Sequence, residues 1–396
     1  MLNEADHRSL GQRMDLFHLQ EEAPGSVFWH PRGWALYRAI EERVRSELRR
    51  AGYLEVRSPQ VLAQSIWEQS GHWQNFRADM LGVDDGERAA ALKPVSCPGH
   101  IQLFKRGVVS YRDLPVRFAE LGLCHRNESR GALQGLFRLR QFCQDDGHIF
   151  CSDDQVGPEL ERFLRSLPPF YSELGFRELE VALSGRPKVS GGDDAEWRWA
   201  EESLEAAARA AGMEPRPQPG QGAFYGPKLE IALRDRAGRS WQCGTIQLDI
   251  VLADRFDASY VDSSGARQRP RILHRAMLGS LERFIALLLE HHEGALPAWL
   301  APEQVRIVSV GDGVEAYARE VLGSLERAGL RAGIDSSAES LGRKIIDARQ
   351  LGVPFMAVVG KREAAAGRVS VRSRSGEQEE LERGAAVRFL VDRCGR

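Results

Sequence analysis

Residues 122–148 read GLCHRNESRGALQGLFRLRQFCQDDGH, and the rest of the chain is interpreted around this charged, aromatic run. We interpret it as two antiparallel strands joined by a glycine-bearing loop. Pairing the strands brings Arg126 and Arg138 near each other, and the alternation of side chains sends both to a common face. Two fixed guanidinium groups suit a polyphosphate, because their planar forks match phosphate oxygens. The alternative is a solvated hairpin whose charges bind nothing.

The composition excludes several broad classes of protein. The chain has 396 residues, enough for more than one domain and a large buried core. Lysine and arginine total 54 against 56 aspartates and glutamates, so a net charge of −2 gives no overall attraction to nucleic acid or membrane. Six scattered cysteines without a CxxC pair fit a reducing, cytoplasmic location. We find neither a signal sequence nor an apolar run of the ~18 residues that a membrane span needs.

The N-terminal part is predicted to begin with a long amphipathic helix. Apolar residues recur at four-residue steps between Gly33 and Gly52, which predicts a helix, and the second glycine is typical of a helix end. The alternating residues YLEVRSP then predict a strand that closes on Pro59. Residues 70–81, SGHWQNFRADML, are interpreted from their composition as an aromatic-rich loop.

One cysteine precedes a Pro-Gly turn. Cys97 lies in ALKPVSCPGH, and His100 opens a predicted helix. A lone cysteine in a globular enzyme is usually a small buried hydrophobe, and no second ligand stands at zinc-finger spacing. From the residues alone, packing is therefore the favoured role of Cys97, and a ligand role is the alternative.

Residues 222–256 predict a second pair of antiparallel strands, joined through RAGR. The polar side chains expected to point inward are Tyr225, Lys228, Gln242 and Gln247. Glycines at positions 226 and 244 would let a ligand approach the backbone closely. An ordinary hairpin with polar surface residues is the alternative.

A strand and a helix are predicted after this hairpin. His274 is expected to end the strand, and apolar residues from Leu278 to Leu288 then have helical spacing. Arg283 stands among these apolar residues. If it faces inward, it needs an anionic or aromatic partner.

A proline-marked boundary near residues 297–302 separates two predicted domains, residues 1–300 and 301–396. Beyond the boundary, predicted strands and helices alternate. This alternation is typical of a small α/β domain.

Together these stretches resemble the class II aminoacyl-tRNA synthetases in their threonyl form. The strings that carry the resemblance follow in order along nearly the whole chain: HPRGWALYR, SGHW, KPVSCPGH, HRNESRGALQGLFRLRQF, DDGH, AFYGPK, WQCGTIQLD and LHRAMLGSLERF. The resemblance implies an α+β fold, with the class II antiparallel sheet flanked by helices and followed by a small α/β anticodon-binding domain. It also implies an ATP-dependent ligase that activates L-threonine to threonyl-adenylate and transfers it to tRNA(Thr).

The resemblance assigns a zinc site to three residues that lie far apart in the sequence. Cys97, His148 and His274 match the cysteine and two histidines that bind the catalytic zinc of threonyl-tRNA synthetases. Three protein ligands leave a tetrahedral zinc one position short. In that family the amino and hydroxyl groups of threonine both bind the metal, and valine lacks the hydroxyl. A site built to engage a hydroxyl rejects an analogue without it by ~10⁴-fold or more.

The resemblance also implies roles for the other site residues. Arg126 is expected to hold the α-phosphate of ATP, Glu128 the adenine edge, and Arg138 the outer phosphates. Phe142 and Arg283 are expected to sandwich the adenine. The remaining assignments are Asp146, Tyr225 and Gln247 in the amino-acid pocket, Lys228 and Gln242 beside the nucleotide, and Arg126, Arg283 and Lys228 as the catalytic cations. Mg²⁺ would bridge the phosphates, and positive charge offsets the charge of the transition state without a covalent nucleophile.

Two departures from the family pattern change what we expect. The chain begins where the family's catalytic domain begins, so we expect no N-terminal small domain and no editing domain, and hence serine activation without hydrolysis of Ser-tRNA. The predicted C-terminal helix begins DSSAESLGRKII, where the family usually shows DxRNExxGxKIR. Ser337 and Ala338 cannot supply the anticodon contacts of that motif, and Ile346 replaces an arginine. Glu363 and Arg372 do match anticodon-contacting positions.

The expected partners are L-threonine, tRNA(Thr) and a second copy of the chain, with no membrane. The helix and strand that close on Pro59 resemble motif 1, through which this family forms homodimers. Two other functions remain open. An enzyme that loads threonine onto a carrier protein or small molecule is favoured by the weakened anticodon positions. The other is a paralogue that is catalytically silent or that acts in stress or resistance. A silent copy, however, has no need to keep the arginines of a phosphate-binding site and the three residues of a zinc site.

Overall fold

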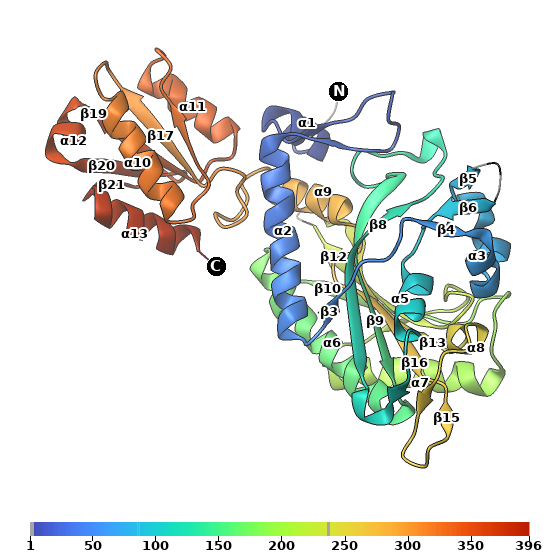
Figure 1. Ribbon diagram of the computed structural model, residues 1–396. Helices are drawn as coiled ribbons and strands as arrows, with labels where there is room; N and C mark the ends of the chain where they lie inside the picture. Colours follow the sequence, from blue (N-terminus) through green and yellow to red (C-terminus); the bar gives the residue numbers. More distant parts are fainter. Residues whose placement is uncertain (1–3, 85, 87, 236–237, 396) are drawn as a thin grey trace. The chain divides into compact units, whose positions relative to one another are not determined.

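The computed structural model describes residues 4–84, 86, 88–235 and 238–395, which form two compact units (Figure 1). The smaller unit takes Met1–Gln20, Val27–Glu42 and Leu288–Arg396, and the larger unit takes Glu21–Ser26 and Arg43–Leu287. The helices α2, Pro31–Arg50, and α9, Leu281–His291, contribute residues to both.

The larger unit is built on an eight-stranded sheet with the strand order β11-β10-β12-β13-β16-β9-β8-β3 (Figure 1). Neighbouring strands are antiparallel, except that β3 is parallel to β8 and β11 is parallel to β10. The bounds are β3 Leu54–Glu55, β8 Val116–His125, β9 Gln141–Cys151, β10 Leu179–Ser184, β11 Arg216–Gln218, β12 Lys228–Arg234, β13 Ser240–Asp249 and β16 Arg271–Ala276. The expected α+β class with an antiparallel sheet is confirmed.

The strand register sorts residues onto the two faces of this sheet. His274 lies opposite His148 in the β16–β9 pair, and Gln247 lies opposite His274 in the β13–β16 pair. Residues directly opposite in a ladder share a face, whereas successive residues along a strand point to opposite faces. We call the side of His148, His274 and Gln247 the front face, and the side of Asp145 and Arg275 the back face.

Helices cover both faces. On the front, α5, Cys97–Phe104, and α8, Leu252–Arg255, pack in one apolar cluster with strand residues such as Phe150. On the back, α6, Asp153–Glu173, lies beside α7, Asp194–Ala210. A capping box begins α6, and its buried apolar residues follow helical spacing against the sheet.

Short elements complete the larger unit. The helical ones are α3 Gln64–Ser70, α4 His72–Phe76, η1 Arg77–Asp79, η2 Tyr111–Asp113 and η3 Arg130–Ala132. Two small sheets join β4 Val61–Ala63, β6 Ala89–Leu92 and β5 Gly82–Asp84, and β15 Arg267–Gln268, β14 Tyr260–Val261 and β7 Val109–Ser110.

The smaller unit holds a five-stranded sheet in the order β18-β17-β19-β20-β21, of which the first three strands are parallel. The bounds are β17 Val305–Val310, β18 Ala332–Asp335, β19 Phe355–Gly360, β20 Arg368–Ser373 and β21 Gln378–Glu382, with α10 Glu315–Arg327, α11 Leu341–Gln350, α12 Lys361–Ala366 and α13 Arg383–Cys394. The unit also contains α1 His7–Arg13, β1 Phe17–His18 and β2 Phe28–Trp29. The predicted α/β alternation is present, while α12 and β21 were not predicted.

The strand predicted to close on Pro59 is shorter than expected. Only Leu54–Glu55 form β3, because Ser58 turns inward to donate to the Glu120 carboxylate at 2.7 Å and proline has no N–H for a ladder. Arg236 and Ala237 of the predicted RAGR turn lie outside the described residues. No helix within the described ranges combines the length and the apolar character that crossing a bilayer requires.

Candidate active site and metal centre

The first predicted strand pair is antiparallel as expected, but its ladder does not extend to Arg138. The β8–β9 ladder ends where His125 lies opposite Gln141, and the N–H of Arg126 donates to the carbonyl of Arg140 at 2.8 Å. Arg138 lies in the connecting loop, where its Nε donates to the Glu128 carboxylate at 2.9 Å. The loop takes residue 138 out of the ladder, so strand alternation does not set its direction.

Three predicted arginines are nevertheless close enough to influence one another electrostatically. Burial lowers the pKa of Arg283, and the positive charges of Arg126 and Arg138 lower it further. The Nε of Arg283 donates to the Phe137 carbonyl at 3.1 Å, and the guanidinium of Arg126 lies 5.1 Å from the centre of the Phe142 ring. Mutually repelling cations of this kind favour an anionic ligand, because the anion offsets their repulsion.

A cavity of about 160 Å³ opens on the front face, and we call it the front cavity. Seven predicted site residues line it: Cys97, Arg126, Asp146, His148, Tyr225, Gln247 and His274. The other six do not line it: Glu128, Arg138, Phe142, Lys228, Gln242 and Arg283. Lys228 pairs with Glu230 at 2.5 Å, and Gln242 donates at 3.3 Å to the hydroxyl of Thr245, itself a lining residue.

The three predicted metal ligands converge in this cavity. One ligand atom each from Cys97, His148 and His274 lie within 4.8 Å of one another, and all three residues are buried. The two histidines face each other directly, with Nε2 of His148 3.0 Å from Nδ1 of His274. Which of these nitrogens carries a proton follows from what the opposite edge of each ring contacts.

The far edge of His274 is held by a fixed carboxylate. Its Nε2 lies 2.8 Å from Oδ2 of Asp249, whose Oδ1 accepts the N–H groups of Val251 and Leu252 at 2.8 and 2.9 Å. An ionised carboxylate only accepts hydrogen bonds. Nε2 of His274 therefore donates to Asp249, and Nδ1 is bare when the ring carries this single proton.

The far edge of His148 leads into a buried chain of polar side chains. Nδ1 of His148 lies 2.8 Å from Nδ1 of His100, and Nε2 of His100 lies 3.2 Å from Oε2 of Glu120. Glu120 also accepts from Lys93 and Ser58, each at 2.7 Å. Although burial alone would raise it, the hydrogen bonds from His100 and Lys93 bring the pKa of Glu120 down to about 2.

This chain fixes the tautomer of His148. Because ionised Glu120 accepts, Nε2 of His100 is the donor, and Nδ1 is an acceptor when the His100 ring carries a single proton. Nδ1 of His148 must then donate to it, which leaves Nε2 of His148 bare. We call Lys93, Ser58, Glu120, His100 and His148 the front relay.

The two bare nitrogens face each other at 3.0 Å beside the thiol of Cys97. A second proton on His148 would turn this contact into a hydrogen bond. Burial, and then the neighbouring histidines, oppose it by lowering the pKa of His148 well below its usual range. Burial, followed by the charges of Asp146 and Asp249, raises the pKa of the Cys97 thiol well above its usual range. Two imidazole nitrogens and one sulfur at this spacing are a donor set that suits a tetrahedral Zn²⁺.

A further histidine faces the same point. The Ser70 hydroxyl donates to the Trp67 carbonyl at 3.0 Å, so its oxygen accepts from Nδ1 of His72 at 2.8 Å. Burial lowers the pKa of His72 to about 3, so the ring is neutral and Nε2 is bare. This Nε2 lies 4.0 Å from Sγ of Cys97.

The opposite wall of the front cavity carries the predicted amino-acid contacts. The Tyr225 hydroxyl donates to Oε1 of Gln247 at 2.7 Å, and its ring stacks on His274 with centres 5.0 Å apart. Oδ1 of Asp146 lies 4.0 Å from Nδ1 of His148. A carboxylate, an amide and a phenol thus lie together beside the three ligand atoms.

Sequence reasoning missed five residues of this site: Lys93, His72, His100, Glu120 and Asp249. His100 offered a weak signal, since it lies three residues after Cys97 on α5 and so on the same helix face. Glu120 and Asp249 offered none, because a single acid within a strand resembles any surface carboxylate. The segment containing His72 was interpreted only as an aromatic-rich loop.

Comparison with known families identifies both parts of the chain. Residues 76–292 match the model of the tRNA synthetase class II core domain (G, H, P, S and T). Residues 304–393 match the model of an anticodon binding domain. The first match contains the whole front cavity.

Two curated relatives have similar sequences. The chain is 52 % identical over 377 residues to the threonine--tRNA ligase of Cupriavidus necator, covering 94 % of this chain and 59 % of that protein. It is 49 % identical over 379 residues to the threonine--tRNA ligase of Burkholderia mallei, covering 95 % of this chain and 60 % of that protein. The chain therefore spans about three fifths of the length of these relatives.

Two solved structures have similar folds. The RNA binding domain of threonyl-tRNA synthetase from Cryptosporidium parvum superposes with a TM-score of 0.95 at 40 % identity, covering 98 % of both chains. A putative threonyl-tRNA synthetase from Aeropyrum pernix gives a TM-score of 0.81 at 26 % identity, covering 99 % of this chain and 98 % of that one. On these matches, the chain belongs to the threonyl-tRNA synthetase family of the class II aminoacyl-tRNA synthetases.

Proposed function

We propose that this protein activates L-threonine with ATP and transfers the threonyl group to tRNA(Thr). The observation that carries the proposal is the convergence of Cys97, His148 and His274 in the cavity that Arg126 also lines. That arrangement would place a hydroxyl-selecting metal centre beside a phosphate-binding cation. The membership in the threonyl-tRNA synthetase family supports the same substrates.

Cys97, His148 and His274 would hold a zinc ion through Sγ, Nε2 and Nδ1 respectively. A zinc held by these three residues would have open positions for the amino and hydroxyl groups of threonine, and valine, which lacks the hydroxyl, would fill only one of them. The front relay and Asp249 act on the protein side, because they keep both imidazole nitrogens unprotonated and directed at the same point.

The chain's own residues would perform the remaining steps by position and charge. Arg126 holds the α-phosphate of ATP while the threonine carboxylate attacks it in line, and pyrophosphate leaves. The other proposed contacts are Glu128 to the adenine edge, Arg138 to the outer phosphates with Mg²⁺, Phe142 and Arg283 around the adenine, Lys228 and Gln242 beside the nucleotide, and Asp146, Tyr225 and Gln247 around the amino acid. The tRNA terminal ribose hydroxyl then attacks the adenylate carbonyl and releases AMP.

Further features of the proposal concern partners. We retain residues 1–300 as the catalytic domain and 301–396 as the anticodon-binding domain. A homodimer would form through the region near Pro59, and the protein would act in the cytoplasm. Selection of threonine over serine is expected to be weak, because both carry a hydroxyl and one methyl group gives only ~1–3 kcal/mol of discrimination.

One observation in the smaller unit favours an acceptor of the activated threonine other than tRNA. On α11, Leu341 is 38 % exposed and Ile346 is 50 % exposed, where an RNA-binding helix would present polar side chains. The alternative proposal is therefore that activated threonine passes to a carrier protein or small molecule. Catalysis up to the adenylate is the same in both proposals.

The test is ATP–pyrophosphate exchange with threonine, serine or valine, with and without a zinc chelator. We expect exchange with threonine, weaker exchange with serine, almost none with valine, and loss of exchange after chelation. Absence of threonine-dependent exchange by the zinc-loaded protein would overturn the proposal and favour a silent paralogue. Aminoacylation of a tRNA(Thr) transcript, compared with label transfer to a carrier, then separates the two acceptors.

A further inference from the structure

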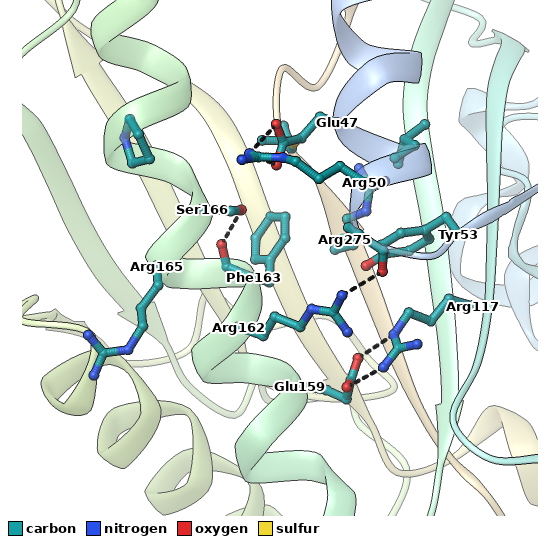
Figure 2. A pocket seen from close by; sticks show the side chains of 14 residues that line it. Glu47, Arg50, Tyr53, Arg117, Glu159, Arg162, Phe163, Arg165, Ser166 and Arg275 are labelled. Atoms are coloured by element: carbon teal, nitrogen blue, oxygen red, sulfur yellow. Dashed lines mark hydrogen bonds and ion pairs between the residues drawn. The ribbon is translucent and has the colours of Figure 1, made fainter.

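A second cavity, of about 340 Å³, lies on the back face of the eight-stranded sheet, and we call it the back cavity (Figure 2). Its walls come from the C-terminal end of α2, the following Tyr53, one face of α6, and the strands β8 and β16. It contains none of the predicted site residues. Of its lining residues, Arg275 also borders the front cavity.

The charged lining of the back cavity is predominantly positive. Five arginines line it against two glutamates. Two of the arginines form ion pairs with the two glutamates. Arg117 binds Glu159 through two contacts of 2.7 and 2.6 Å, and Arg50 contacts Glu47 at 2.6 Å (Figure 2). These pairs balance both glutamates, so the positive charge that remains belongs to the other three arginines.

Arg162 is the arginine best placed to bind a ligand. It is exposed on α6, and its Nη2 donates to the carbonyl of Ala51 at 3.0 Å across the cavity (Figure 2). Among the residues that the structure describes, no carboxylate lies within ion-pair distance of its guanidinium. Arg165, by contrast, pairs with Glu161 at 2.7 Å.

Arg275 adds an incompletely paired cation beneath the cavity. Its side chain is 1 % exposed, and Nη1 lies 3.3 Å from the carboxylate of Asp145. Nε and Nη2 are buried and have no hydrogen-bond partner in the described part of the chain. Buried donors in native proteins are normally satisfied by protein, water or ligand, because each unmade hydrogen bond is unfavourable.

The rest of the lining is apolar except for Ser166. Tyr53 covers the guanidinium of Arg275 with its ring centre 4.6 Å away, and Leu48, Phe163, Pro169 and Met277 complete the walls. A volume of about 340 Å³ falls within the range of small-molecule sites. Apolar walls with one unpaired guanidinium fork match a singly charged, planar acid better than a polyphosphate, which would require several unpaired cations.

We propose that the back cavity binds a small organic carboxylate with an apolar or aromatic body. Arg162 holds the carboxylate, and the body packs against Tyr53 and Phe163 above the buried charge of Arg275. The site lies on the opposite face of the sheet from the front cavity. A ligand there leaves the threonine and ATP positions open.

The proposal is tested with 2-naphthoate as the probe, titrated into the full chain by isothermal titration calorimetry. We expect saturable binding, and binding of the neutral 2-naphthamide that is weaker by about tenfold or more, because it cannot form the charge-assisted pair. Replacement Arg162→Met should weaken 2-naphthoate by a similar factor. The matched control Arg126→Met, on the front face, should leave its affinity unchanged.

A steric variant makes the test independent of charge. Ser166 lines the back cavity from α6, so Ser166→Trp should fill it and abolish probe binding while the unfolding temperature stays near that of the unmodified protein. The proposal is overturned if the unmodified chain does not bind 2-naphthoate at millimolar concentration, or if the amide binds equally well. It is also overturned if Arg126→Met weakens binding and Arg162→Met does not.

Discussion

The front relay consists of buried polar side chains, whereas the surface of α11 exposes apolar ones. In the larger unit, Lys93, Glu120 and His100 are almost fully buried, and each contacts the next in a continuous chain. On α11, by contrast, Leu341 and Ile346 are exposed. Removing one member of a buried chain leaves another without a partner, whereas a change on an exposed helix removes or adds one solvated contact. The same kind of substitution should therefore have far larger effects on the relay.

The largest effect is expected from Cys97→Ser. The variant should lose bound zinc, because the soft sulfur ligand is gone, and the ~10⁴-fold preference for threonine over valine that we expect of the zinc site should collapse. Metal content by inductively coupled plasma mass spectrometry and pyrophosphate exchange with both amino acids measure these losses. Cys151→Ser, a buried thiol on the same sheet and outside the front cavity, is the matched control. Equal zinc content in the two variants would contradict the metal assignment.

Glu120→Gln should follow in size. The change leaves Lys93 buried and unpaired, which we expect to lower the free energy of unfolding by roughly 3–5 kcal/mol. It also frees the tautomer of His100, and so of His148, which should weaken zinc binding by roughly 10–100-fold. Chemical denaturation and competition with a zinc chelator measure the two effects. Glu178→Gln, at an exposed position near the same sheet, should change neither.

Lowering the pH should gradually remove the stabilisation that the ionised Glu120 carboxylate gives to the folded protein. The pKa of Glu120 is about 2 in the folded protein against an ordinary value of 4.5, so the ionised carboxylate stabilises the fold above pH 4.5. As the pH falls from 4.5 toward 2, this contribution, at most roughly 3 kcal/mol, should disappear. The difference in unfolding free energy between the unmodified protein and Glu120→Gln should therefore narrow over that interval. A constant difference would mean that Glu120 does not titrate in this way.

The smallest effect is expected from Ile346→Arg on α11. The side chain is half exposed, so an arginine fits without repacking and restores the residue that the family usually has there. One added phosphate contact should raise the affinity for tRNA(Thr) a few-fold and steepen its salt dependence by about one unit of log–log slope. Filter binding at several salt concentrations measures both quantities. An unchanged affinity would favour the carrier as the acceptor of the activated threonine.

The fold was largely predictable from local pattern. The steps of apolar residues after Gly33 predicted α2, and the alternation after residue 302 predicted the α/β unit. The errors occurred where side chains override the pattern. The strand toward Pro59 ends early because Ser58 turns to Glu120. Arg138 lies outside the ladder because the loop continues past it and β9 begins only at Gln141.

The candidate metal site was predictable through family resemblance alone. Cys97, His148 and His274 come from a helix and two strands, so no spacing along the chain relates them. The partners that set their protonation were not predicted, since Glu120 and Asp249 become adjacent to histidines through sheet pairing and tertiary packing. Arg275 was overlooked for a related reason: it is the neighbour of His274 but points to the opposite face.

X-ray absorption at the zinc edge of the metal-loaded protein tests the central claim most directly. The account predicts one sulfur at about 2.3 Å and two imidazole nitrogens at about 2.0–2.1 Å, with nitrogen or oxygen ligands added when threonine is supplied. A zinc coordination shell without sulfur would contradict the account. So would a shell that neither threonine nor valine changes.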